Sequence, residues 1–382
     1  KPGLVIYVPG SGLSTGAISL LTSSQVAALF YSTFAEFTSE QVAAFTTTNI
    51  VGLYDKQLAA LNAANIAGLE SQDLARISTT AIVGLEPEDI AQLSSLQLQS
   101  ITTAQFAALL PSQIAGLSTA QIALLSTGQI QALTTSNITG LSSDQIARLD
   151  STQIQALNTT NIVGLTSSQV AALTPTNIAG LESQDLARIS TAAIQGLETE
   201  DIAQLSSLQL QSITTAQLAA FLPSQIAGLS TAQIGLLSTS QIQALTPSNI
   251  AGLTSSQLAA FTSSSIAALQ SQDLAAISTE AIQGLETEDI EQFTSTQVRG
   301  LSRSQIEQLT STQLRAFTTG AIAALSGEQI RGFSPEGIAN LSTAQLAAIK
   351  PGLVIYVPGS GLSTGAISLL TSSQVAALFY ST

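Results

Sequence analysis

The sequence of 382 residues contains no Cys, His, Met or Trp. Thiolate and imidazole are the groups that most often serve as nucleophile, general base or transition-metal ligand in proteins. Their absence excludes those chemistries and also any disulfide. A chain without the most readily oxidised side chains suits an extracellular or cell-surface location, which is where we expect this protein to act.

Positive charge is scarce, since 10 Lys and Arg stand against 24 Asp and Glu, for a net charge of −14. Binding to phosphates needs a concentrated cationic surface, so no nucleic-acid partner is expected. Purely apolar runs such as LVIYV are far short of the roughly 18 to 20 residues of a membrane-spanning helix. No signal-peptide pattern is visible and Lys1 is not a natural start, which predicts an excerpt of a longer protein.

Repetition is what the sequence has in abundance. The first 33 residues return letter for letter as residues 350–382, so the repeating block is 349 residues long. Within it, Ser14 to Ile349 divides into 42 consecutive octads without an insertion or a deletion. These boundaries predict four parts: a junction segment at 1–13, an octad array at 14–349, a second junction at 350–362, and the start of the next array at 363–382.

The octad has the form cap, x, x, Gln, Ile, x, small, Leu, as in STAQIALL from Ser118 and SSDQIARL from Ser142. Its fifth and eighth positions are large and apolar in all 42 octads. A spacing of i, i+3 places both side chains on one face of a helical turn, whereas on a strand they would point to opposite faces. The pattern therefore favours helix.

The polar residues also indicate helices. Of the 42 residues that follow an eighth position, 28 are Ser or Thr, and Gln, Asn, Asp or Glu usually stands three residues later. This is the capping box of a helix N-terminus. Prolines within the octads always come directly after the cap, which predicts the first helical position: they are Pro87, Pro111, Pro175, Pro223, Pro247 and Pro335.

One continuous helix is excluded, because eight residues at roughly 100° each overshoot two turns by about 80° and would wind the apolar stripe around the helix. We therefore predict an all-α solenoid of very short helices, one of about five to seven residues per octad, with a β-solenoid as the alternative. A small seventh residue, such as Gly52 or Gly116, would let neighbouring backbones approach closely. Longer duplications start at Asn65, Asn177 and Ser265, at offsets of 14 and 11 octads, so a superhelical turn need not hold a whole number of octads.

The 13-residue junction, KPGLVIYVPGSGL, breaks the octad register. LVIYV is β-branched and aromatic and is bounded by Pro and Gly, which predicts one short β-strand. Such a strand could join successive blocks of the solenoid by pairing with a neighbour. Alternatively, it could simply cover the open end of the apolar core.

Charged residues offer few candidates for chemistry. Three acidic clusters could cap helix N-termini or bind calcium, and capping is the favoured interpretation: Glu86, Glu88 and Asp89; Glu198, Glu200 and Asp201; Glu286, Glu288 and Asp289. Two i, i+3 pairs are expected to be solvated ion pairs: Asp73 with Arg76 and Asp185 with Arg188. The one basic neighbourhood could meet an acidic region of another block or serve solubility: Arg299, Arg303, Arg315 and Arg331.

Motifs such as LTSSQVAAL at Leu21 and LSTAQIALL at Leu117 resemble those of very long tandem-repeat surface and fibre proteins of Gram-negative bacteria. The resemblance covers all 42 octads and implies secretion and a fibre, stalk or adhesin role, with no catalytic residues. LTPTNIAGL at Leu173 also resembles the helix start of transcription-activator-like effector repeats, but their period, basic charge and base-reading loop are absent.

The sequence thus predicts a structural protein that is not an enzyme, with no catalytic, cofactor or metal residues to name. We expect an extracellular filament or surface fibre built from 349-residue blocks, whose partners are neighbouring copies joined head to tail. The alternative is an adhesin stalk or binding solenoid that displays a repetitive Ser, Thr and Gln surface to a cell-surface or matrix partner. No transmembrane segment is expected.

Overall fold

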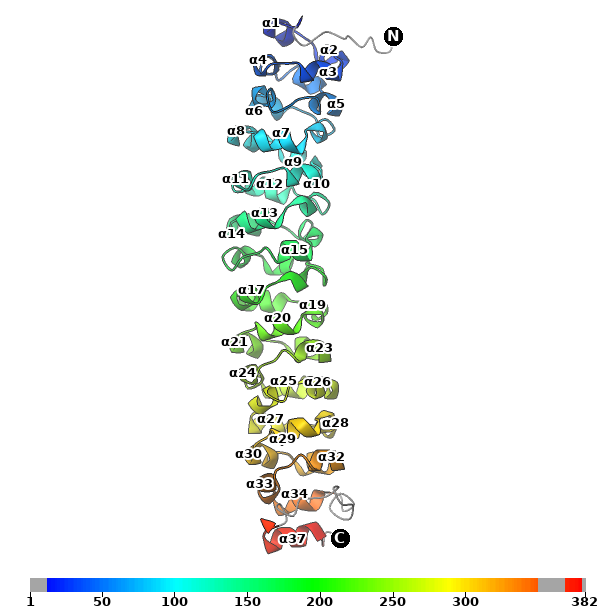
Figure 1. The fold of residues 1–382 in the computed structure, drawn as a ribbon, viewed down its shortest axis with the longest axis vertical. Coiled ribbons are helices and arrows are strands. Elements are labelled where there is room, and N and C mark those ends of the chain that lie inside the picture. Colours follow the sequence, from blue (N-terminus) through cyan, green and yellow to red (C-terminus); the bar gives the residue numbers. More distant parts are fainter. Residues whose placement is uncertain (1–11, 350–367, 380–382) are drawn as a thin grey trace. The chain divides into compact units, whose positions relative to one another are not determined.

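A computed structural model of the chain describes residues 12–349 and 368–379. Within these ranges every element is a short helix and none is a β-strand, which confirms the all-α solenoid over the β-solenoid (Figure 1). The strand expected in LVIYV, at residues 4–8 and 353–357, lies outside the described residues.

The helices follow the octads one to one. All 42 octads of residues 14–349 hold one helix each, 34 of them α-helices of four to six residues and eight of them 3-10 helices of three or four. The α-helices are slightly shorter than the expected length of about five to seven residues, because the backbone becomes extended at or near the eighth position of the octad. By its contacts the chain forms two compact units, residues 1–196 and 197–382.

The elements of the first unit are α1 (Thr15–Ser19), α2 (Ser23–Ala28), α3 (Tyr31–Ala35), α4 (Ser39–Val42), η2 (Ile50–Gly52), α5 (Asp55–Leu58), η3 (Ile66–Gly68), α6 (Ser71–Leu74), η4 (Ile82–Gly84), α7 (Pro87–Gln92), α8 (Ser95–Ser100), α9 (Thr103–Ala108), α10 (Pro111–Ala115), α11 (Thr119–Ile122), α12 (Thr127–Gln131), η5 (Asn137–Gly140), α13 (Ser143–Arg148), α14 (Ser151–Gln155), η6 (Ile162–Gly164), α15 (Ser167–Val170), η7 (Ile178–Gly180), α16 (Ser183–Leu186) and η8 (Ile194–Gly196).

Those of the second unit are α17 (Thr199–Gln204), α18 (Ser207–Ser212), α19 (Thr215–Ala220), α20 (Pro223–Ala227), α21 (Thr231–Gly235), α22 (Thr239–Gln243), α23 (Pro247–Ile250), α24 (Ser255–Leu258), α25 (Ser263–Ala268), α26 (Ser271–Ala276), η9 (Ala281–Gly284), α27 (Thr287–Glu291), α28 (Ser295–Gly300), α29 (Arg303–Glu307), α30 (Ser311–Arg315), α31 (Thr319–Ala324), α32 (Gly327–Ile330), α33 (Pro335–Ala339), α34 (Thr343–Ala348) and α37 (Ser372–Phe379).

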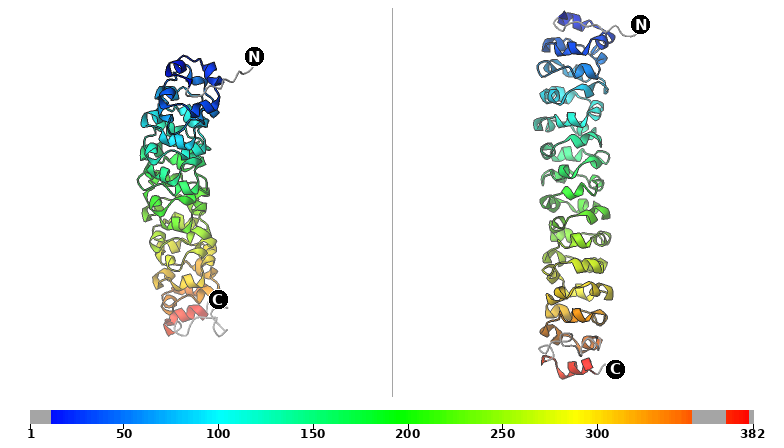
Figure 2. Two further views of the ribbon diagram at one scale, coloured as in Figure 1. Left: turned by 45° about the horizontal axis from the view of Figure 1, so that its top comes forward. Right: turned by 45° about the vertical axis from the view of Figure 1, so that its right-hand side comes forward.

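The core consists of the two apolar positions of each octad. Every fifth-position side chain from Ile18 to Leu346 is at most 3% exposed, and every eighth-position side chain from Leu29 to Ile349 is at most 7% exposed. Burial of one such side chain contributes roughly 1.5 to 3 kcal/mol, less than the ordering of eight residues costs. Each octad therefore depends on the turns stacked against it, which both views of Figure 2 show as successive layers within each unit.

The capping boxes are present as predicted. In octad 102–109, for example, the Thr102 hydroxyl accepts from the Gln105 backbone N–H at 3.2 Å, and the Gln105 side chain accepts from the Thr102 N–H at 2.9 Å. Five of the six prolines occupy the start of an α-helix. The prediction is wrong for Pro175, which lies in a turn before the 3-10 helix η7.

A superhelical turn holds between three and four octads. Side-chain amides at the fourth position donate to backbone carbonyls 28 and 31 residues earlier, as Gln105 does to Ile77 and Leu74. The glycine at the seventh position approaches the carbonyl 29 residues earlier, as Gly52 does at Ser23. The turn is therefore not a whole number of octads, as the offsets of the long duplications indicated.

The eight 3-10 helices share a sequence rule. Each lies in an octad with a short fourth residue, Asn or Ala, and with Gly at the seventh position. Every fourth-position Asn in the array has this glycine three residues later: Asn49–Gly52, Asn65–Gly68, Asn137–Gly140, Asn161–Gly164, Asn177–Gly180 and Asn249–Gly252. Five of these octads form 3-10 helices and the sixth, that of Asn249, forms α23. Since Asn is one methylene shorter than Gln, it reaches the carbonyls of the preceding turn only where the two backbones come closer.

Glycine permits this approach. A Cβ at Gly252 would overlap the backbone carbonyl of Pro223. We predict that Gly252→Ala lowers the free energy of unfolding by about 1 to 3 kcal/mol, as overpacking of a close contact does. Gly235 is the matched control, because its Cβ would meet nothing nearer than the Ala260 oxygen at 3.6 Å. Gly235→Ala lies inside α21 and should raise stability by about 0.5 to 1 kcal/mol, measured by urea denaturation.

The double variant Asn249→Gln, Gly252→Ala tests the coupling directly. It gives the octad a Gln at the fourth position, and the longer Gln side chain can reach the carbonyls of a preceding turn that lies further away. It should recover part of the stability that Gly252→Ala alone loses, a non-additive result typical of residues that share one contact. Strict additivity of the two single changes would contradict this explanation.

Candidate functional site

Apart from the core, the feature that recurs most often among the octads is an amide side chain at the fourth position. It is Gln or Asn in 28 of 42 octads, and we call these side chains the amide ladder. They were expected on a polar surface, but from Gln57 onward they are buried, and Gln105, for instance, is 2% exposed. The Gln surface that the adhesin alternative required is therefore not formed by these residues.

In Gln105, every hydrogen-bonding group of the side-chain amide has a partner. Its Oε1 accepts from the Thr102 N–H and hydroxyl at 2.9 and 3.0 Å. Its Nε2 donates to the carbonyls of Leu74 and Ile77 at 2.8 and 2.7 Å. A primary amide offers two donors and two acceptor sites, so all four are satisfied. One side chain thus caps the N-terminus of its own helix and binds the C-terminal carbonyls of a helix in the preceding turn.

Asn side chains make the same contacts. We call the hydrogen bonds of one such amide, to its own cap and to the preceding turn, a rung of the ladder. The Asn65 Oδ1 accepts from the Asn62 N–H at 2.8 Å, and its Nδ2 donates to Phe34 and Phe37 at 2.9 and 3.2 Å. Sequence reasoning identified the capping half of this interaction and missed the contact between turns. The missed signal is that Glu, which completes a capping box as well as Gln does, never occupies the fourth position. Only a side chain that also donates meets both requirements.

Six octads carry Asp at this position, and all six carboxylates are at most 4% exposed: Asp73, Asp89, Asp185, Asp201, Asp273 and Asp289. The predicted surface ion pairs with Arg76 and Arg188 are wrong, because within residues 12–349 neither arginine is paired and Asp73 and Asp185 are buried. The Oδ1 atoms of Asp73 and Asp185 have no hydrogen-bond partner. Burial, aided by the charge of Glu70, raises the pKa of Asp73 to about 6, and burial with Glu182 does the same for Asp185.

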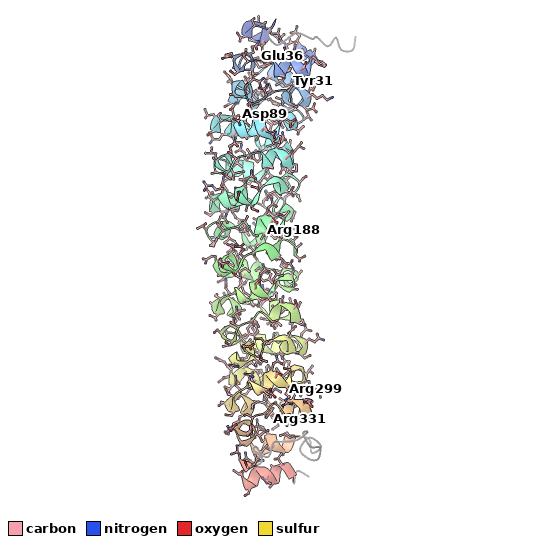
Figure 3. All side chains as sticks on the ribbon, in the orientation of Figure 1. Tyr31, Glu36, Asp89, Arg188, Arg299 and Arg331 are labelled. Atoms are coloured by element: carbon pink, nitrogen blue, oxygen red, sulfur yellow. The ribbon has the colours of Figure 1, made fainter. Side chains whose placement is uncertain are left out.

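The acidic clusters do not converge. Glu86 and Glu88 are exposed, whereas Asp89, labelled in Figure 3, is buried. In the third cluster the Asp289 carboxylate accepts from the Glu286 N–H at 3.1 Å, which is the capping role. Within the described ranges no three carboxylates are grouped so as to hold a metal ion, so the calcium interpretation gains no support.

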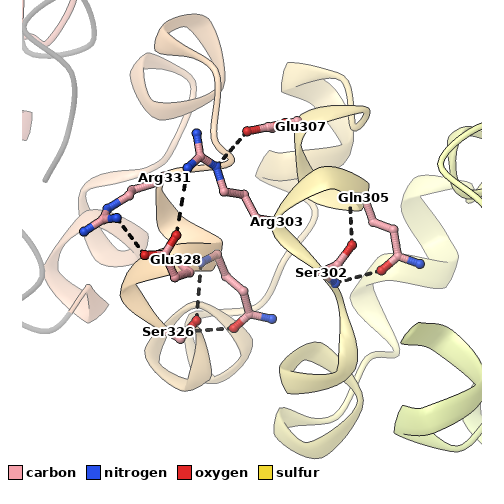
Figure 4. A network of polar contacts seen from close by, with 8 residues as sticks. Ser302, Arg303, Gln305, Glu307, Ser326, Glu328 and Arg331 are labelled. Carbon is pink, nitrogen blue, oxygen red and sulfur yellow. Dashed lines mark hydrogen bonds and ion pairs between the residues drawn. The ribbon is translucent and has the colours of Figure 1, made fainter. Parts of the chain in front are cut away.

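Two arginines of the basic neighbourhood form an ion-pair network with glutamates of the same chain (Figure 4). Arg303 contacts Glu307 at 2.7 Å and Glu328 at 3.9 Å, and Arg331 contacts Glu328 at 2.6 Å. Arg299 lines the same shallow hollow beside Arg303 and Glu328. Such exposed pairs contribute little to stability. The expectation that these arginines meet another block is therefore weakened, because two of them already have acidic partners.

The geometry defines the class of the protein as a tandem-repeat α-solenoid whose turns are joined by side-chain amides. The ALTTAQ repeat model matches most of residues 82–343, at 82–119, 103–135, 122–159, 146–181, 178–215, 194–231, 210–247, 266–303, 282–319 and 306–343. The chain belongs to the ALTTAQ repeat family. No curated protein matches the sequence. The architecture is compatible with a structural or a binding repeat protein, and within residues 12–349 and 368–379 no helix has the length and apolar character to cross a bilayer.

The buried aspartates predict a pH dependence with a definite sign. Because the pKa of Asp185 is about 6 in the folded chain and near 3.8 when unfolded, the folded state binds more protons between these values. Its contribution is therefore most favourable below about pH 4 and is lost as the pH rises through 6. Asp185→Gln recreates an octad like SSDQIARL, where Gln145 coexists with Arg148. It should raise the free energy of unfolding by about 2 to 3 kcal/mol at pH 7.5.

Urea denaturation at pH 7.5 and pH 4.5 measures this change, and the gain should shrink at the lower pH. Asp144→Asn is the control, because Asp144 is an exposed residue in the first turn of α13. It should change stability by a few tenths of a kcal/mol at either pH. A gain for Asp185→Gln that is equal at both pH values would show that Asp185 is not a buried charge.

Proposed function

We propose that this chain is part of a structural protein that forms an extracellular filament or surface fibre from tandem 349-residue blocks. The observation that carries the proposal is the amide ladder. Most of its amides bind the same pair of carbonyls of the preceding turn, at offsets of 28 and 31 residues, as Gln57 does in the first unit and Gln329 in the second. An array built on such a rule has no internal feature that ends it, which is the property a fibre needs.

The proposal includes a non-catalytic role and a location at the cell surface. What supports the first is the uniformity of the octads, whose polar groups are consumed by caps and ladder rungs rather than gathered at one place. What supports the second is composition, namely the absence of oxidisable Cys and Met and the net charge of −14.

A binding solenoid is the second candidate, and one surface feature favours it. Leu96 and Leu208 occupy the same place in the twin helices α8 and α18 and are 73% and 72% exposed. Leu96 also borders a shallow hollow with Glu70, Gln72 and Gln92. Exposed leucines on an otherwise polar repeat are suited to contact a partner, though each is single rather than part of a broad patch.

Negative-stain electron microscopy tests the two functions. We expect a chain that carries two copies of the block to form unbranched fibres of the same width as the present chain and twice its contour length, without any ligand. The matched variant Leu96→Ser, Leu208→Ser should leave these fibres unchanged. Particles that stay dispersed until a cell-surface extract is added, and that lose this response in the Leu→Ser variant, would favour the binding solenoid and contradict the fibre.

A further inference from the structure

The residue offsets of the ladder hydrogen bonds also report the register of the octads on the two sides of the 13-residue junction. Inside the array a fourth-position amide binds the eighth-position carbonyl 28 residues earlier, which lies four octads back. If a segment between the two takes the place of whole octads, the offset grows only by the number of residues that the segment has in excess of those octads. Among the described residues, one rung spans a junction and allows the count, and a second binds the last residue of a junction.

The first rung is that of Gln374, in the octads that follow the second junction. Its Nε2 donates to the carbonyls of Ala339 and Leu341 at 2.8 and 2.9 Å. Leu341 is the eighth residue of its octad, and it lies 33 residues before Gln374 rather than 28. The surplus is five residues, which equals the 13 residues of the junction less the eight of one octad.

The second rung lies at the other copy of the junction and shows where that junction ends. Gln41 donates through Nε2 to the carbonyl of Leu13 at 2.6 Å, at the regular offset of 28 residues. Leu13 is the last residue of the first junction. It therefore takes the role of an eighth-position residue, so the last residue of the junction is already in the register of the octads that follow it.

From these two rungs we infer that the last octads of one array form the docking surface for the first octads of the next copy, and that the junction counts as one octad with five residues to spare. The partner is thus a second copy of the sequence that begins at Ser14. The solenoid runs on from block to block in unbroken register. This inference rests on the proposed function and specifies how its blocks join.

The two copies of the docked segment differ as the inference requires. Gln25 is exposed, and in the part of the chain that the structure describes its Nε2 meets no carbonyl, whereas the identical Gln374 is half-buried on the α33–α34 octads. Leu20 is 84% exposed, and its counterpart Leu369 is 50% exposed. The helix α37 packs on α34. The same residues therefore lose exposure where a preceding array is present.

Substitution of one residue in two places tests the docking. Gln374→Glu keeps the acceptor for the capping box and the side-chain volume but removes both donors to Ala339 and Leu341. Hydrogen exchange by mass spectrometry on the full chain should show amides of residues 372–379 exchanging about ten- to a hundredfold faster than in the unmodified chain. Gln25→Glu is the matched control, with the same neighbours in sequence, and should leave exchange in residues 15–28 unchanged. Equal effects at both sites, or none at Gln374, would overturn the inference.

Junction length tests the register. Removal of residues 351–355 leaves eight junction residues, and removal of 350–362 leaves none; both keep the octads in phase and should preserve the slow exchange of residues 372–379. Removal of 351–359 leaves four, which puts the following octads out of phase, and should abolish it. A flexible tether instead predicts a gradual change with length, and that outcome would overturn the counting rule.

These measurements read a contact within one chain, so they are informative whether or not fibres form. Normal exchange behaviour without fibres would reject the proposed function and keep the register. Fibres in which the amides of residues 372–379 exchange rapidly would support the proposed function and reject the register.

Discussion

A helix of four to six residues cannot satisfy its own backbone, and the fourth-position amide is the interaction that resolves this problem. The first four N–H and last four C=O groups of any helix lack partners within it, so in such short helices nearly every backbone polar group is terminal. Gln105 supplies an acceptor to its own N-cap and donors to Leu74 and Ile77 of an earlier turn. The apolar pair per octad gives the solenoid its driving force, but without the amide each buried turn would leave carbonyls unpaired at about 1 to 3 kcal/mol apiece.

The variants of the octad follow from this one requirement. The distance between a cap and the carbonyls of the preceding turn is spanned by Gln, or by the shorter Asn if the turns approach more closely. Close approach requires the seventh residue to be Gly, because a Cβ at Gly252 would overlap the Pro223 carbonyl. Asp meets this requirement only in part: Asp273 and Asp289 cap their helices, but an ionised Asp has no donor, and the Oδ1 of Asp73 is left without a partner. Burial and the charge of Glu70 raise the pKa of Asp73, and the protonated carboxyl then has a donor.

Local chemistry made much of the fold predictable. One helix per octad, the Ser and Thr caps, five of the six proline positions and the buried Ile and Leu follow from spacing and from backbone hydrogen bonding within eight residues. The contacts between turns did not follow, because they join residues 28 to 31 apart and no local pattern specifies that distance. For the same reason Asp73 was assigned to a surface ion pair with Arg76, which i, i+3 spacing alone suggests. The exclusion of Glu from the fourth position and the strict pairing of Asn49 with Gly52 were visible in the sequence, but they become meaningful only once the neighbouring turn is known.

The same geometry explains why 42 octads follow one another without an insertion. The amide of an octad binds the helix four octads back, while its seventh residue contacts the octad three back, as Gly52 does at Ser23. Each helix therefore rests on two helices of the preceding turn, in a staggered arrangement. A single inserted residue would move every later amide away from its carbonyls and every small residue away from its close approach, in all the turns that span the insertion. Whole octads can be gained or lost freely, because neighbouring octads are nearly equivalent and the turn is not a whole number of them. Within the array, duplication in multiples of eight is thus the route of growth that this structure permits, and the duplications at Asn65, Asn177 and Ser265 obey it.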